Sequence, residues 1–313
     1  MSFLRSFVVV FAIITPVAVF AQSLSAQSLS AQSRADTTFA IARSGVIDIT
    51  LRSGRLLVRG SERTDAELRA NGTNYELRSS GVGVTLTTSG GSRWSSSNRD
   101  REERLELIVP RNVRLIISAR SADVNVRDVS GDVEIHAVSG DVVLHAIGGR
   151  AIVETLSGDL EITDGVGDLR ATTMSGDVVA HGIRGTAEVH TTSGSVALGM
   201  PHANRVQVES VSGDIMFDGM PSDAANFQLT THSGDVTLRM PDGARGVLDV
   251  STFSGEITTN SALTLTSGGA ARSGRRERSG QHFEFGGGGA TLISISTFNG
   301  DIRLEHGARR PPE

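Results

Sequence analysis

Residues 130–179 read SGDVEIHAVSGDVVLHAIGGRAIVETLSGDLEITDGVGDLRATTMSGDVV, with a glycine at every ninth position from Gly131 onward. The nine-residue period starts at Ala122, which occupies the place of the first glycine, and continues without insertion or deletion to Gly194. Its strong form is Ser-Gly-Asp, and after Gly140 strong and weak forms alternate, so the full repeat is 18 residues, with two half-turns per coil. A fixed period this short predicts a solenoid, in which each coil buries its apolar face only against its neighbours.

Each nine-residue unit also carries the pattern of a β-strand. Counted from the glycine as zero, positions two and four are apolar in every unit, as at Val142 and Leu144, and the residues between them are mostly polar. Alternation with a period of two is typical of a half-buried strand, and the glycine suits a corner because it has no Cβ. Position seven is often apolar as well, at Val129, Val138, Ile147, Leu156, Met174 and Ile183.

Later units keep the pattern at wider spacing. The glycines at 213, 234, 255 and 300 follow at steps of 19, 21, 21 and 45 residues. The extra residues follow apolar-proline pairs such as Met200-Pro201, and proline suits a strand end or corner. We therefore expect an all-β fold: a single parallel β-solenoid of the β-helix or β-roll type over residues 39–306, with ~18–21 residues per coil.

A hydroxyl residue stands two positions before the serine of each strong unit in the second half of the chain. Because this stripe survives the change in coil length, we expect it to stack vertically at about 4.8 Å spacing. The favoured interpretation is a structural ladder of hydrogen-bonded hydroxyls, and the alternative is a flat recognition face. The ladder consists of Thr155, Thr173, Thr191, Ser210, Thr231 and Thr252.

Acidic residues directly after the glycines form another column, which raises the question of calcium. Nonapeptide repeats of secreted toxins bind calcium between coils with the pattern Gly-Gly-x-Gly-x-Asp. The units here read Ser-Gly-Asp-apolar, which supplies few ligands per site, so the sequence favours turn carboxylates that accept backbone N–H groups. We expect no metal and no cofactor; the calcium alternative would use Asp141, Asp159, Asp177, Asp214 and Asp235.

The histidines do not share a metal-binding spacing. His145 and His181 share the outward phase but lie two coils apart, roughly 10 Å at strand spacing, which is too far for one tetrahedral metal. His136 and His190 take the same outward phase. His232 falls near a turn, and we expect it to be a hydrogen-bonded core residue.

Two polar excursions interrupt the solenoid, at 89–104 and 267–289. Mixed charge with glycine and serine predicts solvated, mobile loops, and long loops on a rigid scaffold are also where binding residues gather. The candidate binding residues in them are Trp94, Arg99, Arg101, Arg272, Arg275, Arg276 and Arg278.

The two ends of the chain carry different signals. Residues 1–21 combine Arg5, an apolar stretch and a small-residue cleavage site, which predicts a secretory signal peptide. Residues 22–38 form a low-complexity linker, and 307–313 a polar tail. We expect no integral membrane segment in the mature chain. The protein is therefore predicted to be exported and to be periplasmic, on the cell surface or secreted.

Composition narrows the function classes. The chain has no cysteine, so stability must come from stacking, and its net charge of -5 argues against nucleic acid as a partner. Enzymatic β-helices that act on acidic polysaccharides need clustered catalytic groups, and sugar binding recruits aromatic platforms. With one tryptophan and one tyrosine, the chain is predicted not to be an enzyme.

The repeated Ser-Gly-Asp-Val units, the apolar-proline corners and the signal peptide resemble a bacterial family over roughly residues 40–305. That family is the β-strand-repeat "putative adhesin" domain of unknown function, which is related to the head domains of autotransporter adhesins. The resemblance implies a non-enzymatic adhesive or structural module, which has no catalytic residues to carry over.

We therefore expect a secreted or cell-envelope scaffold that presents the hydroxyl stripe and the two loops to a surface polymer or protein. The terminal coils would also self-associate edge to edge unless they are capped. Three alternatives remain: a calcium-stabilised β-roll, a periplasmic accessory of envelope stress or signalling, and, least favoured, a polysaccharide-active enzyme.

Overall fold

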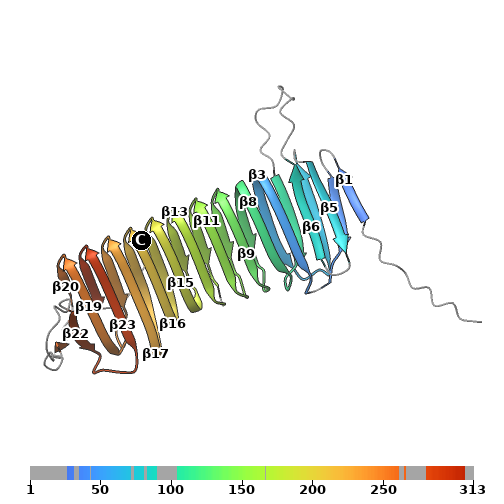
Figure 1. Ribbon diagram of the computed structural model, residues 1–313. Helices are drawn as coiled ribbons and strands as arrows, with labels where there is room; N and C mark the ends of the chain where they lie inside the picture. The colour runs from blue at the N-terminus through green and yellow to red at the C-terminus, as the bar shows by residue number, and fades with distance from the viewer. Residues whose placement is uncertain are drawn as a thin grey trace, which may run out of the picture.

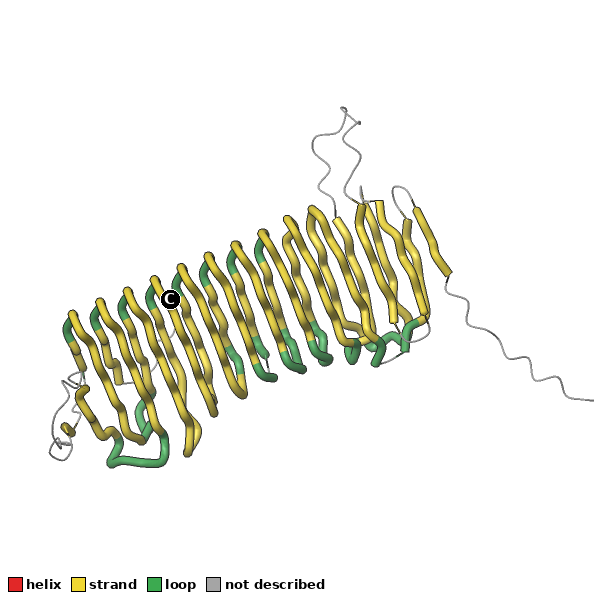
Figure 2. The backbone as a smooth tube through the Cα atoms, viewed as in Figure 1, coloured by secondary structure: helices red, strands yellow, loops and turns green. Residues whose placement is uncertain are grey.

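The computed structural model describes residues 27–31, 35–42, 44–71, 74–80, 83–89, 104–165, 167–260, 264–265 and 280–306. Within these ranges the secondary structure consists of β-strands without a helix. The strands stack along one axis into an elongated body (Figures 1 and 2). The expected all-β architecture is confirmed, with most strand pairs parallel.

The centre of the body consists of two layers, and the chain alternates between them. Layer 1 contains the longer strands β9 (Val133–Ser139), β11 (Ala151–Ser157), β13 (Leu169–Ser175) and β15 (Arg184–Ser193). Layer 2 contains the four-residue strands β10 (Val142–His145), β12 (Leu160–Thr163) and β14 (Val178–His181). Register partners lie 18 residues apart in both layers, for example Val153 with Ala171 and Leu144 with Ile162, so one 18-residue repeat forms one coil.

Four longer strands run from one layer into the other. They are β3 (Val46–Ser61), β8 (Arg114–Arg127), β16 (Val196–Ser212) and β17 (Ile215–Ser233). Their burial alternates along each layer, because every second side chain points to the space between the layers. These inward side chains form one continuous apolar core, in which Phe217 and Phe227 pack with ring centroids 4.8 Å apart.

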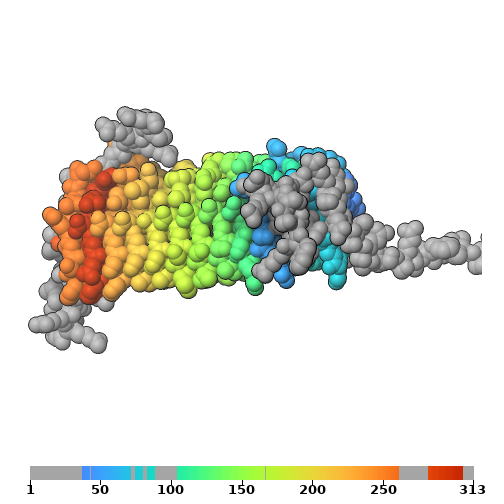
Figure 3. All heavy atoms as spheres, turned by 90° about the horizontal axis from the view of Figure 1, so that it is seen from above, coloured from blue at the N-terminus to red at the C-terminus, as the bar shows by residue number. Residues whose placement is uncertain are grey.

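Stacking order departs from chain order at the C-terminal end. The strands there are β18 (Val236–Met240), β19 (Gly246–Ser254), β20 (Ile257–Thr259), β21 (Thr264–Leu265), β22 (Gly280–Phe285), β23 (Leu292–Asn299) and β24 (Ile302–His306). β23 pairs with β17 on one side and β19 on the other, and β24 pairs with β18 and β20. The last strands of the chain thus lie inside the stack, as the red band between orange bands in Figure 3 shows.

The N-terminal end has a related arrangement. Its strands are β1 (Gln27–Ala31), β2 (Ala35–Ala40), β4 (Asp65–Asn71), β5 (Asn74–Ser80), β6 (Gly83–Ser89) and β7 (Arg104–Pro110). β3 lies between β8 and the later strands β6 and β7. β5 and then β1 continue layer 1 in antiparallel pairing, and β4 and then β2 continue layer 2 in the same way.

Three expectations are corrected at these ends. The stack is not wholly parallel, because antiparallel strands occupy both ends, including β22 on β19. The predicted linker 22–38 contains β1 and the start of β2, since the outermost strands leave backbone donors and acceptors that a further strand can satisfy. The predicted mobile loop 267–289 contains β22, whose Phe283 and Phe285 are buried.

Other predictions fall outside the described residues. These are the signal peptide 1–21, the tail 307–313 and all seven loop candidates: Trp94, Arg99, Arg101, Arg272, Arg275, Arg276 and Arg278. In the part of the chain that is described, no helix is long and apolar enough to span a bilayer.

Candidate functional site

The acidic column joins neighbouring coils through the backbone. Oδ1 of Asp141 accepts a hydrogen bond from the N–H of Asp159 at 3.0 Å, and Oδ1 of Asp159 accepts from the N–H of Asp177 at 2.9 Å. The same contact recurs from Asp177 to Ser195 and from Asp214 to Asp235. These carboxylates therefore act as turn acceptors between coils. Among the described residues, no group of three or more His, Asp or Glu side chains is arranged to hold a metal.

The predicted hydroxyl ladder is in register and faces inward. Thr155 pairs with Thr173, Thr173 with Thr191, and Thr191 with Ser210. The column continues through Thr231 and Thr297 to Thr252. All of these side chains except the half-buried Thr252 are buried, so the alternative of a flat recognition face is wrong. The reason is strand parity: the hydroxyl residue stands two positions after an inward residue and takes the same direction.

Three members of the hydroxyl ladder lack hydrogen-bond partners. Oγ1 of Thr231 donates to the carbonyl of Gly213 at 3.3 Å, whereas the buried hydroxyls of Thr173, Thr191 and Ser210 have no partner. The middle of the ladder is thus held by packing and backbone pairing.

The residue that follows the hydroxyl ladder forms an exposed apolar line along one corner of layer 1. We call this line the corner ridge; in stacking order it consists of Val138, Leu156, Met174, Thr192, Val211, His232, Phe298 and Phe253. Of the eight large hydrophobic side chains that are exposed within the described residues, six belong to it. Singly exposed apolar residues are ordinary, but a row in which six of eight positions are apolar, interrupted at Thr192 and His232, marks an interaction surface.

The rows of the corner ridge are fixed by strand register. Thr155 and Ser157 pair with Thr173 and Ser175, so Leu156 and Met174 occupy equivalent places on adjacent strands. Successive rows are therefore separated by the strand spacing of about 4.8 Å, and the eight rows extend roughly 34 Å. The ridge is a straight, regularly spaced surface rather than a pocket.

Three aromatic rings close the C-terminal end of the corner ridge. His232 stacks on Phe298 with ring centroids 5.0 Å apart, and Phe298 stacks on Phe253 at 4.7 Å, with the planes within 9° and 4° of parallel. The Phe253 side chain is 75% exposed. His232 was expected in the core; it is exposed instead, because it occupies the ridge position after the inward Thr231.

The sequence pattern places apolar residues at position seven in both kinds of unit and does not show that some are exposed and others buried. Val138, Leu156 and Met174 are exposed in layer 1, whereas Val129, Ile147 and Ile183 are buried. The difference arises at position six, where the layer 2 units have a left-handed residue that reverses the alternation: Asp128 (φ 60), Ala146 (φ 54), Asp164 (φ 58) and Gly182 (φ 70). Position six is threonine in most of the layer 1 units and Asp, Ala or Gly in the layer 2 units, but Ala137 precedes the exposed Val138, so the residue type at position six does not by itself separate the two environments.

Histidines beside the corner ridge lie between carboxylates of neighbouring coils. His136 contacts Glu134 through Nε2 at 3.2 Å and Glu154 through Nδ1 at 3.1 Å. His190 contacts Glu188 at 3.0 Å and Glu209 at 3.3 Å in the same way. These two clusters repeat on the outer surface of layer 1.

One glutamate in each cluster has a lowered pKa. The pKa of Glu134 is lowered by hydrogen bonds from Arg114 and then His136. The pKa of Glu188 is lowered chiefly by a hydrogen bond from His190. The surroundings of Glu134 and Glu188 therefore favour the charged form of these two carboxylates.

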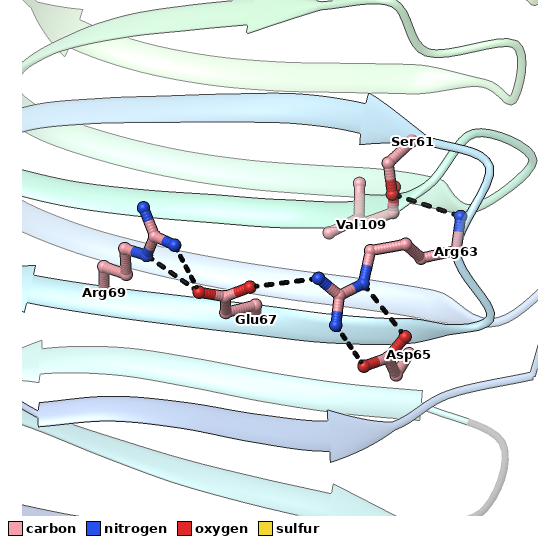
Figure 4. Close-up of polar contacts among 6 residues, drawn as sticks. All are labelled: Ser61, Arg63, Asp65, Glu67, Arg69 and Val109. Atoms are coloured by element: carbon pink, nitrogen blue, oxygen red, sulfur yellow. Dashed lines mark hydrogen bonds and ion pairs between the residues drawn. The ribbon is translucent and has the colours of Figure 1, made fainter.

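A polar hollow of about 310 Å³ lies away from the ridge, between the β3–β4 and β7–β8 turns. Arg63 in its wall contacts Asp65 at 2.9 Å and Glu67 at 3.4 Å, as Figure 4 shows. Arg111 contacts Glu62 at 3.2 Å. Both guanidinium groups are thus paired with carboxylates, so the hollow is poorly suited to an anion.

Comparisons with solved structures show low similarity. A "putative adhesin" from Bacteroides fragilis is 12% identical, with 88% of this chain and 98% of that chain covered and a TM-score of 0.42. A second from Parabacteroides distasonis is 9% identical, covering 88% and 97%, with a TM-score of 0.37. A "putative cell adhesion protein" from Clostridium sporogenes is 8% identical, covering 88% and 100%, with a TM-score of 0.22. Likeness at this level carries no argument about function.

No curated protein matches the sequence. The family model described as Toastrack DUF4097, a domain of unknown function, matches residues 47–305. This range contains both layers from β3 onward and the whole corner ridge. The chain belongs to the Toastrack DUF4097 family.

Proposed function

We propose that this protein is an exported, non-enzymatic adhesive scaffold, a single β-solenoid that presents the corner ridge to a partner in the cell envelope or outside it. The observation that carries the proposal is the ridge itself: a row along the stack in which six of eight positions hold exposed apolar side chains. An apolar surface of this length costs free energy in water and is stabilised when a partner covers it.

The polar groups of the stack support a scaffold role. The aspartates after the glycines accept backbone N–H groups of the next coil, and the histidines beside the ridge bridge carboxylates of adjacent coils. These contacts stiffen the array along its axis. A stiff array fixes the spacing of the ridge residues before binding, which reduces the entropy cost of association.

The two segments that carry the arginines and Trp94 belong to the same proposal as additional contacts. The described ends of the second segment, β21 and β22, pair with each other next to β19, which carries Phe253. A partner bound at the aromatic end of the ridge would therefore lie near Gly280, which pairs with Ser251 and closely follows Arg278 in the sequence.

Co-sedimentation with isolated bacterial envelopes tests the function. We expect the wild-type chain to sediment, and the double variant Leu156→Ser/Met174→Ser to lose at least about tenfold in affinity, since ~1.4 kcal/mol corresponds to tenfold. Ile152→Ser is the matched control, because Ile152 lies on the same strand as Leu156, points outward and is not part of the ridge. Equal sedimentation of all three proteins would remove the ridge from the binding surface.

Location is tested separately by protease treatment of intact cells followed by fractionation. Degradation in intact cells would support surface display. Protection until the outer envelope is opened would place the scaffold in the periplasm, and the adhesive role would then be abandoned in favour of an internal scaffold or accessory.

A further inference from the structure

The corner ridge has the size of a small protein–protein contact. Its six large apolar side chains include Met174 at 56% and Phe253 at 75% exposure. These six side chains alone present on the order of 600 Å² of surface, which is at the upper end of the largest apolar patch on an ordinary monomer. The standard interface buries about 800 Å² per partner, so a dimer contact through the ridge would also include its flanks.

We propose that the occupant of the corner ridge is the ridge of a second copy of this chain, so that the scaffold binds through self-association. This inference rests on the proposed binding function of the ridge and names its partner. The first argument is spacing. The rows repeat at about 4.8 Å because strand pairing sets them, and a second copy has the same repeat. If one row of a ridge contacts a row of the second ridge, all the other rows are in register as well. A polymer with a different repeat distance loses this register within a few rows.

The aromatic end of the ridge favours an apolar protein surface over a sugar. Sugars bind on the faces of aromatic rings, but both faces of Phe298 are covered, one by His232 and one by Phe253. What this cluster offers is mainly ring edges and the open face of Phe253, which suit edge-to-face contact with the same cluster of another copy. Buried aromatic anchors of this kind dominate the energy of protein interfaces.

Charge fixes the relative direction of the two copies. One flank of the ridge is the acidic column that contains Asp159, Asp177 and Asp214, all exposed. A two-fold axis across the stack would place both acidic columns on the same side of the contact, where they repel. A two-fold axis along the stack places them on opposite sides, each facing the partner flank in which His136 and His190 lie among glutamates, a mixed surface that repels an acidic column less than a second acidic column does. The proposed dimer is therefore parallel, and each ridge residue meets its own counterpart.

Sedimentation equilibrium of the purified chain alone tests the self-association. We expect a concentration-dependent dimer that Leu156→Ser/Met174→Ser and Phe253→Ser each weaken at least tenfold, while Ile152→Ser leaves it unchanged. Circular dichroism and thermal melting of each variant establish that the stack is intact. A monomer at every concentration would overturn the inference and leave envelope binding by the ridge as a separate result. A dimer whose stability is unchanged by the ridge variants would place the contact at the terminal coils and would also overturn the inference.

Cysteine crosslinking tests the direction, because the natural chain has no cysteine. In a parallel dimer, Ser139→Cys alone gives a covalent dimer with a short bis-maleimide reagent, and so does Ser254→Cys alone, because each serine directly follows a terminal ridge residue and its replacement leaves the ridge intact. In an antiparallel dimer neither variant crosslinks to itself, and a covalent dimer forms only when the two are mixed. The first result supports the proposed arrangement, and the second contradicts it.

Discussion

Oδ1 of Asp301 accepts a hydrogen bond from the backbone N–H of Glu256 at 3.0 Å, although Glu256 stands 45 residues earlier in the chain. The N–H of Asp301 in turn donates to Oδ1 of Asp235 at 2.9 Å. Strands β23 and β24 thus form a coil that lies between the units of Gly234 and Gly255, although these two units follow one another in the sequence. At this end of the stack, the column of turn carboxylates therefore follows the stacking order rather than the chain order.

Gly300 is the corner of this inserted coil and admits no larger residue. Its φ is +156°, and a Cβ there would lie 2.0 Å from the carbonyl oxygen of Gly234. Gly300→Ala is therefore expected to lower the free energy of unfolding by more than about 3 kcal/mol, since backbone strain alone costs 1–3 kcal/mol and the collision adds to it. Thermal or urea unfolding measures the change.

Gly243 is the matched control for this substitution. It also has a positive φ, +98°, but its Cβ position meets nothing within 4 Å. Gly243→Ala should cost only about 1–2 kcal/mol, the strain of a left-handed residue. Equal losses in the two variants would show that the close approach to Gly234 does not decide the stability of the coil.

The repeat could be predicted from the sequence because it depends on local signals. Glycine at each corner, apolar residues at positions two and four and the 18-residue period each reflect a requirement that every coil must meet. The register Val142 with Leu160 and Val133 with Ala151 follows from these signals alone.

The insertion of β23–β24 could not be predicted in this way. Most coils offer the same backbone edge and an aspartate after the glycine, with Ser195 and Glu256 among the exceptions, so the pattern around Gly300 does not specify which neighbours it will have. The position of β23 and β24 in the stack is accompanied by contacts that the repeat does not encode, such as the antiparallel pairing of β22 with β19. The ridge was missed for a related reason: one left-handed residue decides whether Ile147 points inward while Leu156 points outward.

The unpartnered hydroxyl of Thr191 offers a stabilising substitution. Its Oγ1 is buried without a hydrogen-bond partner, so Thr191→Val removes an unsatisfied polar group at nearly constant shape. We expect a gain of about 1 kcal/mol, because a buried unsatisfied group costs 1–3 kcal/mol, and a rise in Tm of roughly 2–4 °C. Thermal unfolding with circular dichroism detects a shift of this size.

Thr231 provides the comparison in the same column. Its hydroxyl donates to the carbonyl of Gly213 at 3.3 Å, so Thr231→Val should lower stability by about 1 kcal/mol. If both valine variants melt higher, the hydrogen bond of Thr231 contributes nothing, and the two hydroxyls are equivalent.

Acid should weaken the stack through the clusters beside the ridge. The folded pKa values of Glu134 and Glu188 lie below their ordinary value of 4.5, so these groups bind protons more readily in the unfolded chain. Their contribution to stability is present above pH 4.5 and is lost as the pH falls through the lowered folded values. The Tm of the wild type should therefore drop between pH 5 and pH 3.

Amide variants identify the source of that acid sensitivity. Glu134→Gln/Glu188→Gln should show a shallower decline of Tm over the same range, because the titrating carboxylates are gone. Glu161→Gln, on the exposed surface of layer 2, should keep the wild-type slope. An unchanged slope in the double variant would assign the acid sensitivity to other carboxylates, such as the turn column.

Substitutions of Ala146 and Ala137 test whether the left-handed residue at position six decides which side chains form the corner ridge. Both are alanines at position six of adjacent units, but Ala146 has a φ of 54° at the end of layer 2, whereas Ala137 continues the extended strand β9 in layer 1. A left-handed conformation costs alanine about 1–2 kcal/mol, and glycine avoids this strain while losing 0.4–1 kcal/mol of chain entropy. Ala146→Gly should therefore raise the free energy of unfolding by about 0.5–1 kcal/mol. Ala137→Gly should lower it by about 1 kcal/mol, since glycine weakens a strand interior and Ala137 is buried. Urea unfolding of the two variants measures both changes in the free energy of unfolding. Changes of opposite sign are expected if the left-handed residue at position six turns position seven inward in layer 2, and its absence leaves position seven exposed in layer 1. Changes of the same sign would contradict this origin of the ridge.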